Sequence, residues 1–88
     1  MKVEFLKKFS KDLGSITQTK DKRLILEVIN LIKESDNFKD IPNTKKLVGF
    51  KNAYRIRSGN LRIGIFLENS LVQFARVAYR KDIYNLFP

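Results

Sequence analysis

Hydrophobic positions in the first half of the chain recur with the spacing of helices. Met1 to Phe5 alternates weakly, which indicates a short strand. Gly14-Ser15 offers a stop for the helix expected next. The apolar stripe of that helix consists of residues three or four positions apart: Leu6, Phe9, Leu13 and Ile16.

A second, longer helix is predicted after Thr19. Thr19 is a suitable N-cap, and Asp21 is favourably placed near the positive end of the helix dipole. Every position from Leu24 to Ile32 except Glu27 and Asn30 is aliphatic. Such an apolar surface is wider than the single stripe of a surface helix. Either the helix is sandwiched between the first helix and a sheet, or part of it meets a partner chain.

The second half of the chain changes to the period of strands. Ser35 to Lys46 is interpreted as a connecting loop, and alternation begins from Leu47 onward. Gly59-Asn60 and Glu68-Asn69-Ser70 are expected to be turns. The third strand of this series is predicted from Leu71 to Tyr79.

The last stretch, Arg80 to Pro88, is a short basic and aromatic tail that is expected to form a helical turn. The chain contains no internal repeat or low-complexity segment. We therefore expect one domain over residues 1–88, of the α+β class, with helices first and strands afterwards.

The first predicted hairpin gathers like charges. A two-residue turn at Gly59-Asn60 places Arg57 opposite Arg62 and Arg55 opposite Gly64. Directly opposed like charges destabilise a strand pair by up to about 1 kcal/mol. Gly64 leaves space where a large group could approach the backbone.

Two interpretations of these arginines remain open. The side chains of Arg55, Arg57 and Arg62 can fan apart on a solvated face. Alternatively they form an anion site, since the planar fork of arginine matches phosphate oxygens.

Composition narrows the chemistry further. The chain has 88 residues, 18 Lys plus Arg against nine Asp plus Glu, a net charge of +9, and neither histidine nor cysteine. Catalytic triads, His/Cys zinc sites, thiol redox centres and disulfides are therefore excluded. The charge favours a polyanionic partner: nucleic acid, an acidic protein or an anionic membrane. With no membrane span or secretory signal visible, we expect a cytoplasmic protein.

Three stretches carry a family resemblance. The chain has K-L-V-G-F at Lys46–Phe50, Y-R-I-R-S-G-N-L-R-I at Tyr54–Ile63 and R-K-D-I-Y at Arg80–Tyr84. In order and spacing they resemble the RelE/ParE superfamily of bacterial toxins. The resemblance implies a small twisted antiparallel sheet with the two N-terminal helices packed on one face.

The resemblance also implies a function. RelE-like members of type II toxin-antitoxin systems cleave mRNA in the ribosomal decoding site and are neutralised by a cognate antitoxin. By position, Arg55 and Arg57 would contact the scissile phosphate, with Arg62 on the next strand. Arg80 would follow the last strand, and Tyr84 would stack on a nucleobase.

The implied reaction is attack of the 2′-hydroxyl on its own 3′ phosphate, without metal or small-molecule cofactor. The expected catalytic residues are Arg57, Arg62, Arg80 and Tyr84. The expected RNA-binding residues are Arg55, Lys46, Lys51 and Lys81.

The general base stays open. Better-known RelE enzymes have lysines at the positions of Arg55 and Arg57, and arginine stays protonated, so neither can accept a proton. Tyr84 or Lys81 could serve, or the reaction could rely on charge and orientation alone.

Two other functions compete with the nuclease: a ParE-like inhibitor of DNA gyrase, and a non-catalytic member that only partners its antitoxin.

Three further side chains have two interpretations each. Phe66 either packs or stacks on a base; Arg76 either pairs with Glu68 or joins the arginine cluster. Tyr79 either lines the site or caps the end of the sheet.

Overall fold

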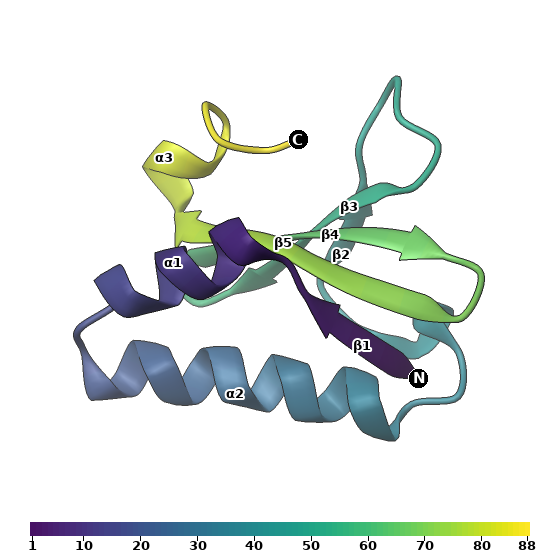
Figure 1. The fold of residues 1–88 in the computed structure, drawn as a ribbon, viewed down its shortest axis with the longest axis horizontal. Helices are drawn as coiled ribbons and strands as arrows, with labels where there is room; N and C mark the ends of the chain where they lie inside the picture. Colours follow the sequence, from purple (N-terminus) through teal and green to yellow (C-terminus); the bar gives the residue numbers. More distant parts are fainter.

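The computed structural model describes residues 1–88 (Figure 1). The elements follow in the order β1 (Lys2–Phe5), α1 (Lys7–Ser15), α2 (Thr19–Glu34), η1 (Phe38–Asp40), β2 (Thr44–Lys46), β3 (Ala53–Ser58), β4 (Leu61–Glu68), β5 (Leu71–Tyr79) and α3 (Arg80–Ile83). The helical first half and stranded second half are as predicted.

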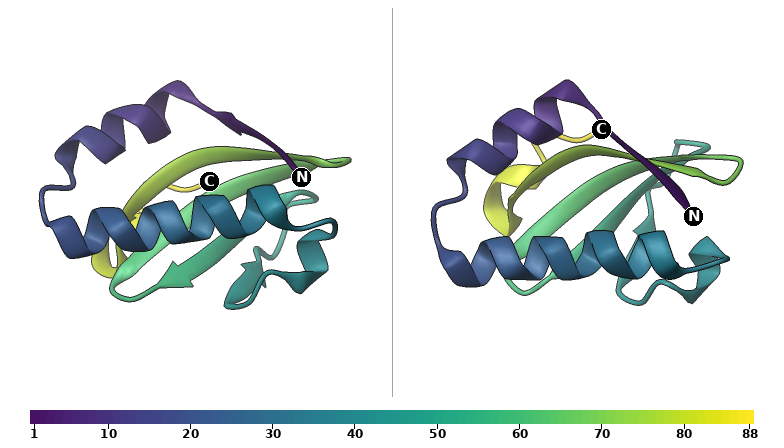
Figure 2. Two further views of the ribbon diagram at one scale, coloured as in Figure 1. Left: turned by 90° about the horizontal axis from the view of Figure 1, so that it is seen from below. Right: turned by 60° about the horizontal axis from the view of Figure 1, so that its bottom comes forward.

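The strands form one sheet of five, in the order β1-β5-β4-β3-β2. All neighbouring pairs are antiparallel except β1 and β5, which run parallel. Figure 2 shows α2 lying across one face of the curved sheet. The main core fills this side, with Phe9 of α1, Ile25 of α2 and Ile63 of β4 fully enclosed. The structure is therefore the expected α+β fold, with both helices on one face.

Helix α2 is buried along one side only. Ile25, Ile29 and Ile32 face the sheet, whereas Leu26 and Leu31 are 55% and 41% exposed. A residue every three to four positions is what a helix lying on one sheet face can bury. The expectation that α2 is sandwiched between α1 and the sheet is wrong, because part of its apolar surface stays open.

Three local predictions were also wrong. Gln18, not Thr19, occupies the N-cap position of α2, and no side chain caps the helix there. The predicted loop from Ser35 to Lys46 contains η1 and the strand β2. β2 has only three residues, Thr-Lys-Lys, so the sequence contains no apolar alternation from which it could be predicted. It is a strand because it pairs with β3. Regular pairing of β3 in turn begins at Ala53 rather than Leu47.

The hairpin register is confirmed. Arg57 pairs with Arg62 and Arg55 with Gly64, as the two-residue turn requires. Gly59 has a φ of +59°, in the left-handed region that glycine adopts without strain. The bounds of β5 and the helical turn after it are confirmed as well.

A second, smaller cluster lies apart from the main core and joins the sheet to the C-terminal segment. Its buried members are Ala53, Ala75, Ala78, Ile83 and Phe87. Alanines on the strands leave room for residues 80–88 to pack close to the sheet. None of the helices combines the length and apolar character required to cross a bilayer.

Candidate functional site

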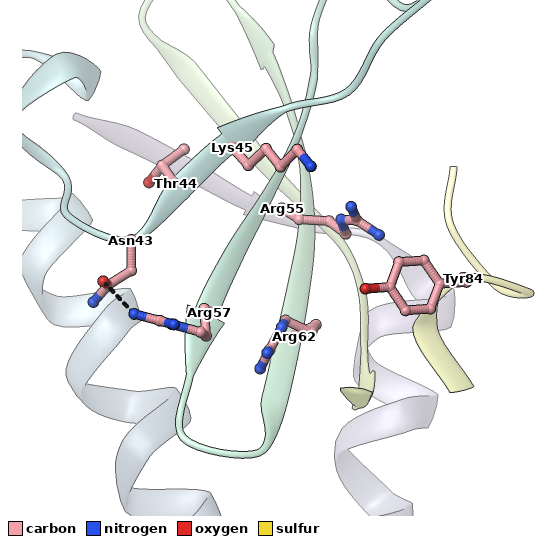
Figure 3. Close-up of a pocket in the computed structure, with 7 residues that line it drawn as sticks. All are labelled: Asn43, Thr44, Lys45, Arg55, Arg57, Arg62 and Tyr84. Carbon is pink, nitrogen blue, oxygen red and sulfur yellow. Dashed lines mark hydrogen bonds between the residues drawn. The ribbon is translucent and has the colours of Figure 1, made fainter. Parts of the chain in front are cut away.

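A cavity of about 280 Å³ opens beside the β2-β3-β4 edge of the sheet (Figure 3). Its lining residues are Asn43, Thr44, Lys45, Arg55, Arg57, Arg62 and Tyr84. The three arginines that the hairpin register placed together do converge, and Tyr84 joins them from the C-terminal segment.

Strand pairing explains why cations gather here. Arg55 and Arg57 alternate onto one face of β3, and Arg62 lies directly opposite Arg57 on β4. On the other side, Lys45 of β2 lies opposite Arg55. Four of the seven lining residues are therefore cationic, and none is a carboxylate, imidazole or thiol.

Arg62 is held by its own hairpin. Its Nη1 donates to the carbonyl oxygens of Gly59 at 3.0 Å and of Leu61 at 2.9 Å. Burial lowers the pKa of the Arg62 guanidinium below its ordinary value, and the charges of Arg80 and Arg57 add to this effect. The positive charges of Arg80 and Arg57 therefore act on the Arg62 guanidinium. The guanidinium remains protonated, and no carboxylate in the cavity offsets its repulsion with these neighbours.

Arg57 is positioned by the residue before β2. The side-chain oxygen of Asn43 accepts a hydrogen bond from Arg57 Nη2 at 3.3 Å (Figure 3). The Asn43 carbonyl oxygen accepts from the backbone N–H of Arg57 at 2.9 Å. Asn43 has a φ of +60°, a conformation that asparagine tolerates better than most residues. This role of Asn43 was not predicted from the sequence. There, Asn43 is only part of the segment that was interpreted as a connecting loop.

Tyr84 closes the cavity over Arg55. The Arg55 guanidinium carbon lies 4.6 Å from the centre of the Tyr84 ring, which is cation–π distance. The Tyr84 side chain stays 62% exposed. An aromatic ring that is both oriented and open to solvent is suited to stacking on a nucleobase.

Arg80 and Lys81 lie next to this cavity rather than in it. With Asn60 and Tyr84 they line a second hollow of about 380 Å³. Tyr84 borders both hollows, so the two form neighbouring parts of one cationic surface. The backbone N–H of Arg80 donates to the Asn60 carbonyl oxygen at 2.9 Å, which fixes the start of α3 at the hairpin turn.

Strand register decides which lysine of β2 lines the cavity. Lys45, which sequence analysis did not select, lines the cavity, while Lys46 pairs with Tyr54 and alternates to the other face. Lys51 is exposed in the loop between β2 and β3 and lies outside both hollows.

The three undecided side chains now have single roles. Phe66 packs, with its ring centre 5.1 Å from that of Phe87. Arg76 pairs with Asp12 at 2.7 Å, so it neither meets Glu68 nor joins the arginine cluster. The Tyr79 hydroxyl donates to Asp21 at 2.7 Å and ties the end of the sheet to α2.

The fold and this site define a class: a small α+β protein whose sheet gathers three guanidiniums and an exposed tyrosine around one cavity. Over its whole length the chain is 43% identical, across 89 residues, to Toxin RelE3 of Methanocaldococcus jannaschii, which it covers completely. The chain therefore belongs to the RelE toxin family.

Solved structures agree with this assignment. The fold matches a chain of the RelB-RelE antitoxin-toxin complex from Methanococcus jannaschii, with a TM-score of 0.79, 39% identity, and coverage of 97% of this chain and 99% of that one. It also matches a chain of the archaeal RelE-RelB complex from Pyrococcus horikoshii, with a TM-score of 0.71, 20% identity, and coverage of 90% and 93%. At that identity the second match shows the fold alone. No family model matches the chain.

Proposed function

We propose that this protein is the toxin of a type II toxin-antitoxin system and acts as a ribosome-dependent mRNA endonuclease in the cytoplasm. One observation carries the proposal: Arg55, Arg57 and Arg62 converge with Tyr84 around a single cavity. Guanidiniums that repel one another are stabilised together by a bound phosphate, and an adjacent ring can hold the base attached to it.

The proposed reaction is an internal transesterification. The 2′-oxygen forms a bond to the neighbouring phosphorus as its proton leaves, and the bond from phosphorus to the 5′-oxygen breaks. That oxygen takes up a proton, and the products are a 2′,3′-cyclic phosphate and a 5′-hydroxyl end. Negative charge grows on the non-bridging oxygens, where Arg57, Arg62 and Arg80 stabilise it more than they stabilise the ground state.

Proton transfer falls to groups at the border of the cavity. Arginines remain protonated and cannot accept the 2′-hydroxyl proton. Tyr84 and Lys81 line the neighbouring hollow. Only a phenolate or a neutral amine can accept that proton, and the protonated form can then return it to the 5′-oxygen. Without a strong base, the rate depends mainly on in-line orientation, which the decoding site and stacking on Tyr84 supply.

The test uses ribosomes programmed with an mRNA that has a defined codon in the A site. We expect cuts at that codon with 2′,3′-cyclic phosphate ends, and loss of cutting with Arg80→Ala. Purified gyrase assayed in parallel should keep its supercoiling activity. Intact mRNA, or inhibited supercoiling, would contradict the proposal in favour of the non-catalytic or gyrase-directed alternative.

An antitoxin similar to RelB is the proposed protein partner. A groove of about 370 Å³ between α2 and β3 is lined by Leu24, Val28 and Leu31, and it reaches Asn43 and Arg57 of the cavity. A segment with apolar residues for the groove and carboxylates for the arginines would cover both. Co-expression with the product of the neighbouring reading frame should relieve toxicity; unrelieved toxicity would rule that partner out.

A further inference from the structure

The segment that carries Tyr84 is fastened at a point that the family motifs do not include. Phe87 is only 5% exposed and rests against the backbone of β4 at Gly64. A Cβ atom built on Gly64 would lie 2.5 Å from Cγ of the Phe87 ring, closer than real contacts allow. Gly64 is thus the floor of a socket that only a residue without a side chain can provide.

A second contact holds the same segment. Nη1 of Arg76 donates to the Leu86 carbonyl oxygen at 3.4 Å. Arg76 is itself fixed by Asp12, to which its Nε and Nη2 donate at 2.7 and 3.1 Å. The polypeptide just before Phe87 is therefore tied through β5 to α1.

The Tyr84 side chain is mostly exposed, so its place depends on how the segment around it is held. Helix α3 is a single turn of four residues, too short to be stable by itself. A hollow of about 400 Å³, bordered by Asp12, Ser15 and Asn85, separates parts of α1 from the segment. Ile83, fully buried, fixes the chain on one side of Tyr84, and Phe87 fixes it on the other.

We propose that Phe87, seated on Gly64, is a positioning residue that holds the Tyr84 ring over Arg55 and so keeps the cavity in its cleaving geometry. This inference rests on the proposed nuclease function for its effect on rate, but its geometric part can be measured without any cleavage. Phe87 is not among the residues that line the cavity, although it packs on Gly64, the strand partner of Arg55. Its proposed effect on the site runs through Tyr84.

The geometric part is tested by NMR on the free protein. The Tyr84 ring shields the side-chain protons of Arg55 at its present distance. Phe87→Ala should shift those protons downfield, as Tyr84→Ala does, and Phe87→Leu should largely restore them. Leu86→Ala is the matched control, since it truncates the adjacent apolar side chain outside the socket. Unchanged Arg55 resonances in folded Phe87→Ala would overturn the proposal.

The functional part is a double-mutant cycle on programmed ribosomes. Tyr84→Ala and Phe87→Ala should each slow cleavage by about 10- to 100-fold, the range for loss of one stacked base. In the Tyr84→Ala background, Phe87→Ala should add less than about a twofold loss, because its only route to the rate is gone. An equal loss in both backgrounds would show a general structural role and overturn the proposal.

Gly64→Ala tests the same contact in a second way, because the added methyl group displaces the Phe87 ring without removing any side chain. It should shift the Arg55 protons as Phe87→Ala does, and be silent when Phe87 is already alanine. Phe87 belongs to the smaller cluster, so the main core and the dispersed amide spectrum should survive in these variants.

The two proposals can fail separately. If the wild-type protein shows the shielding of Arg55 but cuts no mRNA, only the nuclease proposal fails. If it cuts mRNA but the shielding is absent or insensitive to Phe87, only the positioning proposal fails.

Discussion

The guanidinium of Arg62 donates to two carbonyl oxygens of its own hairpin, and these bonds keep it beside other arginines. Its lowered pKa, caused first by burial and then by Arg80 and Arg57, records the cost of this arrangement. A cationic side chain whose pKa is perturbed by like charges in a cavity is a candidate for function rather than for folding. Arg62 is therefore a suitable position at which to compare activity with stability.

We expect Arg62→Ala to slow cleavage by about 10²–10³-fold, the loss typical of one transition-state charge donor. Its free energy of unfolding should stay equal to wild type or rise by up to about 1 kcal/mol, because the opposed Arg57 loses a like-charged neighbour. Cleavage on programmed ribosomes and urea unfolding measure the two effects. A variant that is inactive because it is unfolded would contradict this account.

The Tyr79 hydroxyl gives a pH-dependent prediction. Its hydrogen bond to Asp21, with smaller effects of burial and of the Asp21 charge, raises the pKa of Tyr79 above its ordinary value of 10.0. A raised pKa in the folded state gives stability that is complete below the unfolded pKa and is lost as pH rises through the folded pKa. Tyr79→Phe should therefore melt below wild type at about pH 8, and the gap should narrow above about pH 10. Tyr54→Phe is the control for thermal unfolding followed by circular dichroism; a gap that stays constant up to about pH 11 would exclude this linkage.

At the scale of elements, the parts with strong periodicity were predictable. The β3–β4 hairpin register followed from a two-residue turn with glycine, since pairing outward from that turn leaves no freedom. β2 could not be predicted, because three polar residues have no period and become a strand only by pairing with β3. Helix α2 was predicted in extent but not in packing, because its sequence does not say which aliphatic residues find a partner.

The residues of the candidate site were also predictable only where they lie on strands with a clear pattern. Arg55, Arg57 and Arg62 were found because alternation and one turn fix their faces. Asn43 and Lys45 were missed because their placement depends on β2, the strand without a pattern. The sequence predicted that something large would approach Gly64, but only the folded chain shows that it is Phe87.

The tie between α1 and β5 is a testable element-level interaction. Asp12 accepts two hydrogen bonds from Arg76 and a third, at 3.1 Å, from the backbone N–H of Val77. The Asp12 and Arg76 side chains are only 16% and 18% exposed, so solvent screens the pair little. Asp12→Ala should lower the free energy of unfolding by about 2 kcal/mol, since it leaves a largely buried guanidinium unpaired. Adding Arg76→Met should recover part of the loss in urea unfolding; fully additive losses would show that the two residues are not coupled.

Charge is organised over the whole molecule as well. The net charge is +9, yet the structure contains one ion pair, Asp12 with Arg76, and it lies away from the cavity. The cations of the cavity are thus left without carboxylate partners. A polyanion that enters the cavity displaces counterions, and its affinity falls as salt rises, by an amount set by the number of phosphates contacted. Neighbouring lysines on β2 allow that number to be tested one side chain at a time.

Lys45 and Lys46 are adjacent, equally charged and on the same short strand, but strand alternation directs them to opposite faces. Only Lys45 lines the cavity. Lys45→Ala should weaken binding to programmed ribosomes and reduce the slope of log Kd against log salt by about one, the value for one lost phosphate contact. Lys46→Ala removes the same net charge and should leave the slope unchanged. Equal effects of the two variants would mean that the toxin is attracted by overall charge, and that the cavity is not where the phosphates bind.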